Sequence, residues 1–243
     1  LDAVLRIARQ TGWQAVELRH IDFVRAAEAG QSEDDVIALV RASGLPVCAI
    51  GARLGWMYAE GDERQQLLDI FEATCRRAAA LNCPVVQSPV DVPAGDLQLA
   101  AARVREMGDI AQRYGVRVAL EPICIAQQFS TLASGKALLA AAGHPSVGLD
   151  VDCYHIERSG DGIPEVETLT LDEIVYVQYS DVPADAGPPT PESLLNRLQP
   201  GQGIVPMAEF QRILTAKGYT GPFSFEAPNP AAWDRDPLTV SQE

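Results

Sequence analysis

The chain has 243 residues, of which 47% are hydrophobic, and its 33 acidic and 19 basic residues give a net charge of −14. A chain of this length can bury about three quarters of its surface, so we expect residues 1–243 to form a single domain. The negative charge repels phosphate groups and argues against a nucleic-acid partner, and no apolar run reaches the roughly 18 residues that a membrane span requires.

The five cysteines show no paired spacing. They are Cys48, Cys75, Cys83, Cys124 and Cys153. Their odd number and the lack of a CxxC pair argue against a disulfide framework and a structural zinc site. No signal peptide opens the chain. We therefore expect a cytoplasmic protein whose cysteines are mostly small buried hydrophobes.

Helical and strand-like patterns alternate along the chain. Apolar residues at helical spacing, with Ser32 as a cap and Gly12 and Gly44 as helix ends, support the helices. Helices are predicted at 1–12, 32–44, 62–81, 96–114, 130–142, 164–168 and 206–217. Strands are predicted at 13–20, 46–52, 83–88, 115–121, 147–152, 172–181 and 221–226.

This alternation, in steps of about 30 residues, is typical of βαβ units and a parallel sheet. Seven strands are predicted; the chain begins with a helix and ends where another helix is expected. A (β/α)₈ TIM barrel that lacks its first strand and last helix fits this order better than a doubly wound sheet. No glycine-rich phosphate loop follows any strand, which argues against a Rossmann fold.

The segment VGLDVDCYH (147–155) combines a strand with polar chemistry. Alternation places Asp150 and Asp152 on one face, and His155 follows three residues after the strand ends. Three other predicted strands end in Glu121, Gln178 and Glu226. The carboxyl ends of parallel barrel strands share one mouth, where sites are built.

These four strand-end side chains, Glu121, Asp152, Gln178 and Glu226, are separated by one βα unit or by one unit enlarged by a loop. Three carboxylates and an amide form a hard oxygen shell that suits one Mg²⁺ or Mn²⁺ ion better than zinc. The alternative for each residue is a polar strand end that simply faces water.

The stretches GWQAVELR, VRVALEP, VGLDVDCYH, IVYVQYSD, NRLQPGQG and GYTGPFSFE together resemble the sugar phosphate isomerase/epimerase family, the xylose isomerase-like TIM barrels. The resemblance covers essentially the whole chain. It implies a metal bound by Glu121, Asp152, Gln178 and Glu226, with His155 beside it and Arg197 in contact with substrate. Glutamine at 178, where many relatives carry histidine, is similar to the hydroxypyruvate isomerase and 3-dehydroshikimate dehydratase branches; the loop at 197–203 is similar to inosose isomerase.

The resemblance implies a metal-dependent isomerase or epimerase of a small ketose or keto-cyclitol. Glu121 and Glu226 would move a proton next to the substrate carbonyl, and His155 would donate to a substrate oxygen or orient Asp152. The protein could also be a homo-oligomer.

Three alternatives remain. The first is a dehydratase of the 3-dehydroshikimate type, although EPICIAQQF lacks the histidine that relatives carry shortly after the position of Glu121. The second is a DNA-processing member like the apurinic endonucleases, which use several zinc ions and many histidines; three histidines and the charge of −14 argue against it. The third is a non-catalytic sugar-binding barrel.

Two further features concern the barrel interior. Glu17 and Arg19 share a strand face and are expected to line the barrel as an ion pair. Asp150 stands where relatives usually carry an aliphatic residue, and its side chain is expected to point into the barrel beneath Asp152. A buried acid there needs a partner or a proton.

Overall fold

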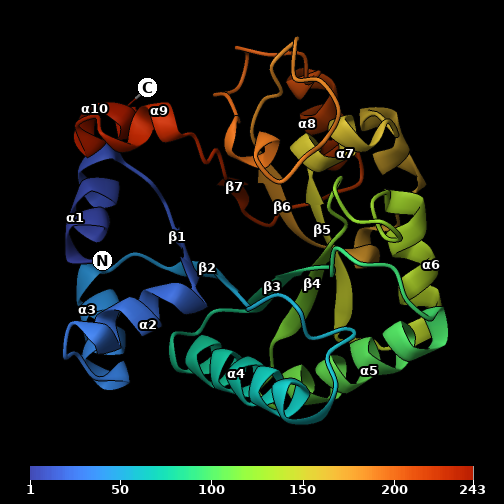
Figure 1. Cartoon of the computed structure of the whole chain (residues 1–243). Coiled ribbons are helices and arrows are strands. Elements are labelled where there is room, and N and C mark those ends of the chain that lie inside the picture. Colours follow the sequence, from blue (N-terminus) through green and yellow to red (C-terminus); the bar gives the residue numbers. More distant parts are fainter. Residues whose placement is uncertain (243) are drawn as a thin grey trace.

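Seven parallel strands lie side by side in chain order and curve into a nearly closed barrel (Figure 1). The computed structural model describes residues 1–242. The strands are β1 (Val16–Arg19), β2 (Val47–Gly51), β3 (Val85–Pro89), β4 (Arg117–Glu121), β5 (Val147–Asp152), β6 (Ile174–Tyr179) and β7 (Phe223–Phe225). Within the described chain β1 and β7 do not pair, so the barrel is open along one seam. The predicted TIM-barrel fold is confirmed.

Helices cover the outside of the sheet (Figure 1). The predicted helices are found, in chain order, as α1 (Asp2–Thr11), α3 (Glu33–Ser43), α4 (Gly61–Ala80), α5 (Leu97–Arg113), α6 (Leu132–Ala142), η1 (Ile163–Thr168) and α8 (Met207–Ala216). Two short 3₁₀ turns, η2 (Leu171–Glu173) and η3 (Ser193–Leu195), lie in connections. No helix in residues 1–242 is long and apolar enough to cross a membrane.

Four helices were not predicted. α2 (His20–Glu28) begins directly after β1, where Asp22 accepts a hydrogen bond from the Arg19 backbone N–H at 2.8 Å. α7 (Cys153–Ser159) begins directly after β5. α9 (Pro230–Trp233) and α10 (Pro237–Gln242) follow β7, so the expectation that no helix follows the last strand is corrected. These helices are short, and short segments carry too few turns for a clear apolar period.

The C-terminal helix lies against the N-terminal one. α10 and α1 are neighbours beside the open seam (Figure 1). The Ser241 hydroxyl is 2.8 Å from the Thr11 hydroxyl and accepts a hydrogen bond from the Trp13 indole at 2.9 Å. The two ends of the chain therefore pack together on the side where the sheet is unpaired.

The core has two parts. A large cluster fills the space between the strands and the outer helices. A small cluster of Ala49, Val85, Ala119, Val175 and Tyr176 lies apart from it. Val85 and Ala119 precede Gln87 and Glu121 by two residues, so they lie on the same strand face, beneath those polar side chains.

Leu149 provides a test of the outer core. Its side chain is fully buried and lies close to Gly135 of α6. We expect Leu149→Ala to lower the free energy of unfolding by about 2–5 kcal/mol through lost burial and a residual cavity. Leu171, which is 43% exposed, is the matched control; Leu171→Ala should cost less than about 0.5 kcal/mol. Urea denaturation of both variants checks this, and equal losses would contradict the packing described.

Candidate metal and substrate site

Glu121 ends β4 and is only 3% exposed. Its Oε2 accepts a hydrogen bond from the Gln87 amide at 2.7 Å, whereas its Oε1 has no hydrogen-bond partner in residues 1–242. Burial, followed by the charges of Glu226 and Asp152, raises the pKa of Glu121 well above its ordinary value. The carboxylate is thus crowded by like charge, and one of its oxygens is free for a ligand.

Asp152 ends β5 and is held from two sides. Its Oδ1 accepts from the Tyr154 backbone N–H at 2.9 Å, which caps α7. Its Oδ2 accepts from Arg197 Nη1 at 2.6 Å. The Arg197 side chain is 4% exposed and its guanidinium carbon lies 4.3 Å from the centre of the Tyr154 ring. Arg197 is therefore a buried ion-pair partner of Asp152, and its contact with substrate stays a prediction.

His155 lies one turn into α7 and is buried. Its Nε2 is 3.4 Å from Glu121 Oε1, 3.8 Å from Asp152 Oδ2 and 3.0 Å from Arg197 Nη2. Burial, followed by the Arg197 charge, lowers the pKa of His155 well below its ordinary value, so the ring is neutral.

The two ring nitrogens of His155 both face donors. The Cys124 backbone N–H lies 3.2 Å from Nδ1, and the guanidinium of Arg197 faces Nε2. A neutral imidazole accepts at only one nitrogen, so both contacts cannot be hydrogen bonds. With the proton on Nδ1, where the Cys124 sulfur lies at 3.3 Å, Nε2 is the accepting nitrogen and the Arg197 guanidinium at 3.0 Å is its donor.

Gln178 is fully buried on β6, paired in register with Asp152 on one side and Ser224 on the other. Its Nε2 donates to Glu17 Oε2 at 3.0 Å. Its Oε1 has no hydrogen-bond partner within the described chain. Like Glu121, Gln178 therefore has a buried side-chain oxygen that accepts no hydrogen bond.

Glu226 lies just after β7 and is the most accessible of the four predicted ligands, with 18% of its side chain exposed. It pairs with Arg19, and its Oε2 lies 3.3 Å from Arg197 Nη1. Glu17 and Arg19 approach each other at 4.0 Å, as expected for a loose ion pair. Burial, followed by the charge of Glu226, raises the pKa of Glu17.

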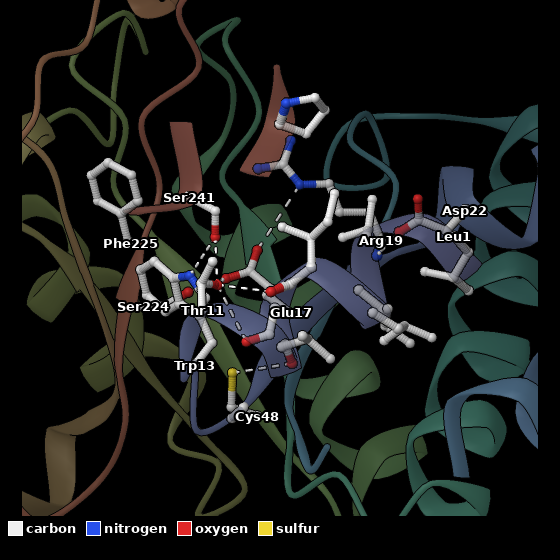
Figure 2. A pocket seen from close by; sticks show the side chains of 18 of the residues that line it. Leu1, Thr11, Trp13, Glu17, Arg19, Asp22, Cys48, Ser224, Phe225 and Ser241 are labelled. Atoms are coloured by element: carbon white, nitrogen blue, oxygen red, sulfur yellow. Dashed lines mark hydrogen bonds and ion pairs between the residues drawn. The ribbon is translucent and has the colours of Figure 1, made fainter. Parts of the chain in front are cut away.

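A cavity of about 1110 Å³ opens along the seam between β1 and β7. Figure 2 shows Glu17, Arg19 and Ser224 around it, together with Trp13 and Phe225. Among residues 1–242, its lining does not include Glu121, Asp152 or Gln178. The cavity therefore extends to Glu17 and Arg19, at the edge of the candidate site, but does not reach its central residues.

Three groups can share an ion. One ligand atom each from Glu121, Asp152 and His155 lies within 4.8 Å of the others, and all three residues are buried. Gln178 adds a buried, unpartnered oxygen on the strand beside Asp152. A buried oxygen without a partner is destabilising unless a hydrogen-bond donor or a cation binds to it. The carboxylate, amide and imidazole groups present here are suitable ligands for a divalent cation. The structure thus brings His155 to Glu121 and Asp152, whereas Glu226 is not part of this group of three; the four-residue cation site stays a prediction.

Asp150 is buried as expected, and both of its oxygens lack a hydrogen-bond partner within residues 1–242. Burial, followed by the charges of Glu121 and Asp152, raises the pKa of Asp150 well above its ordinary value. Both causes favour the protonated form of this acid, in keeping with the expectation that a buried acid there needs a partner or a proton. No contact explains why an acid rather than an aliphatic residue stands there.

Asp181 anchors the loop that carries Arg197. The carboxylate is fully buried and accepts four backbone N–H bonds of 2.8–2.9 Å, from Val182, Gly201, Gly203 and Val205. A Cβ at Gly203 would collide with the Val182 carbonyl, so only glycine permits this approach. Sequence reasoning missed this role of Asp181, and it likewise missed the bond from Gln87 to Glu121.

Comparison with known proteins agrees with the barrel fold. The profile of the xylose isomerase-like TIM barrel family matches residues 5–242. The chain belongs to this family. An inosose isomerase from Halalkalibacterium halodurans is 26% identical over 230 residues, which cover 91% of this chain and 80% of that protein.

Two further proteins are similar to this chain, one in part of its sequence and one in fold. A 3-dehydroshikimate dehydratase from Pseudomonas putida is 32% identical over 133 residues, which cover 54% of this chain but only 21% of that protein. The crystal structure of the IOLI protein with a bound zinc atom superposes with a TM-score of 0.86 at 18% identity, over 100% of this chain and 89% of that one. This last similarity concerns the fold.

The anchoring role of Asp181 is testable. We expect Asp181→Ala to lower the free energy of unfolding by about 3 kcal/mol, because buried N–H groups that lose their acceptor cost about 1–3 kcal/mol each and water restores some of them. Hydrogen exchange should accelerate at the backbone amides of 201–205. Asp185, exposed on the same loop, is the control, and Asp185→Ala should change neither quantity. Unchanged exchange in Asp181→Ala would refute the anchor.

Proposed function

We propose that the protein is a divalent-metal-dependent isomerase or epimerase of a small ketose or keto-cyclitol. The observation that carries the proposal is the pair of buried, unpartnered oxygens on Glu121 and Gln178, beside Asp152 and His155. Two carboxylates, Glu121 at the end of β4 and Glu226 just after β7, would face a bound substrate from two sides. The inosose isomerase relative, similar over most of its length, supports this class of reaction.

The residues proposed to bind the cation are Glu121, Asp152, Gln178 and Glu226, with His155 as a neighbouring nitrogen donor. When bound, the cation would stabilise the negative charge that develops on the substrate oxygens. Three carboxylates and an amide favour Mn²⁺ or Mg²⁺. The bound zinc of the IOLI protein and the nitrogen of His155 make Zn²⁺ the competitor to test.

The chain's own groups would move the proton. Glu226 and Glu121 lie at the ends of β7 and β4, and one carboxylate would take the proton next to the carbonyl while the other returns it. Arg197 would hold Asp152 in place and offer its remaining N–H groups to a substrate oxygen.

A dehydratase is the second candidate, because the 3-dehydroshikimate dehydratase relative is 32% identical over its matching part. The segment 121–129, EPICIAQQF, lacks a histidine that could serve as a further acid. The group that faces His155 there is Cys124, whose pKa burial raises to about 11. A protonated thiol is a weak acid–base group at neutral pH, and we therefore favour the isomerase.

Metal binding can be measured without a substrate. We expect Mn²⁺ at 100 times its Kd to stabilise the protein by about 2.7 kcal/mol, seen as a rise in Tm that EDTA reverses. Asp152→Asn should abolish this rise. Asp34, exposed at the start of α3, is the matched control, and Asp34→Asn should keep it. Mg²⁺ and Zn²⁺ are tested in parallel; a stoichiometric preference for Zn²⁺ would refute the hard-ion proposal.

Turnover tests the two carboxylates. The wild-type protein with Mn²⁺ is screened against inososes, ketoses and 3-dehydroshikimate, and product mass and solvent deuterium uptake are measured. Isomerase chemistry should place deuterium next to the carbonyl, whereas loss of water would show the dehydratase. We expect Glu121→Gln and Glu226→Gln each to lower kcat by about 10²–10⁴-fold. Glu28→Gln, at an exposed position, is the control; full activity in both site variants would exclude the assigned roles.

A further inference from the structure

Glu17 is the acceptor on which a cluster of polar side chains converges inside the barrel. Its Oε2 accepts hydrogen bonds of 3.0 Å each from the Tyr176 hydroxyl, the Gln178 amide and the Ser224 hydroxyl. These donors lie on β6 and β7, whereas Glu17 lies on β1, across the seam where the sheet has no backbone pairing. Figure 2 shows Glu17 and Ser224 facing each other there.

The bond between Glu17 and Gln178 determines which way round the amide lies. A carboxylate only accepts hydrogen bonds, so the NH₂ group of Gln178 must face Glu17. The amide oxygen then points away from Glu17, and it is this oxygen that is buried without a hydrogen-bond partner in residues 1–242. If the amide were reversed, its oxygen would face the carboxylate and its NH₂ group would face the cation.

We infer that Glu17 is a positioning residue for the metal site: by fixing the Gln178 amide, it presents the amide oxygen to the cation. The inference rests on the proposed function, because it needs Gln178 as a ligand. Groups that orient metal ligands in this way typically change metal affinity by about 10–100-fold when they are removed. The glutamine amide has one oxygen and one NH₂ group, and only the oxygen can bind a cation. Its orientation therefore matters more than that of a carboxylate, whose two oxygens are equivalent.

The test is a cycle of four proteins whose Mn²⁺ affinity is measured by titration calorimetry: wild type, Glu17→Ala, Gln178→Glu and the double variant. We expect Glu17→Ala to weaken Mn²⁺ binding about 10–100-fold when residue 178 is glutamine. With Gln178→Glu the ligand has two equivalent oxygens and needs no orientation. In that background, removing Glu17 should leave affinity unchanged or raise it, because two facing carboxylates repel.

A merely structural role of Glu17 would give equal losses in both backgrounds, and that result would overturn the inference. Ser224→Ala is the matched control, since it removes one donor from Glu17 and leaves the bond to Gln178; its Mn²⁺ affinity should stay within about threefold of wild type. If Glu17→Ala does not fold, Glu17→Asp carries the same test, because the shorter side chain withdraws the acceptor and keeps the charge.

The inference and the proposed function fail in different ways. A wild-type protein that binds Mn²⁺ and responds to the cycle as expected but converts no ketose or cyclitol would refute the isomerase and leave the positioning role intact. Conversely, an active isomerase with equal losses in both backgrounds would refute only the role of Glu17. A wild-type protein that binds no divalent cation would refute both.

Discussion

The structure depends on one electrostatic constraint, the crowding of buried acids at the mouth of the barrel. Glu121, Asp152 and Glu226 approach from the ends of three strands, and burial makes their mutual repulsion strong. Arg197 lies among them, where burial disfavours its charge but Asp152, Glu226 and Glu121 raise its pKa above the ordinary value. Within residues 1–242 the pairing is incomplete, because Glu121 keeps an oxygen without a partner.

This constraint explains the construction of the loop after β6. A buried guanidinium must be positioned accurately, since a misplaced charge costs several kcal/mol. Asp181 gathers the backbone of 201–205 around one carboxylate, and Asp181 and Leu198 exchange two backbone hydrogen bonds of 2.8 and 2.9 Å beside Arg197. These hydrogen bonds hold the long polar loop in place, and with it the Arg197 side chain that extends into the site.

The open seam adds a second requirement. β1 shares no backbone hydrogen bonds with β7 in the described chain, so side chains make the connection. Glu17 reaches Ser224 on β7 and Gln178 on β6, and Arg19 reaches Glu226. The same two residues of β1 therefore contact β6, β7 and two of the proposed cation ligands across the seam. In this way the packing of β1 is coupled to the geometry of the site.

The sequence by itself determined the order of the strands, the barrel class and the polar residue at the end of each strand, because these follow from local periodicity and from the shared direction of parallel strands. It also placed Asp150 inside the barrel. Only the tertiary structure decided that Arg197 is buried against Asp152, that His155 joins Glu121 and that Gln178 turns its nitrogen to Glu17. Those contacts join residues between 34 and 161 positions apart or depend on a side-chain rotation, and no local pattern encodes either.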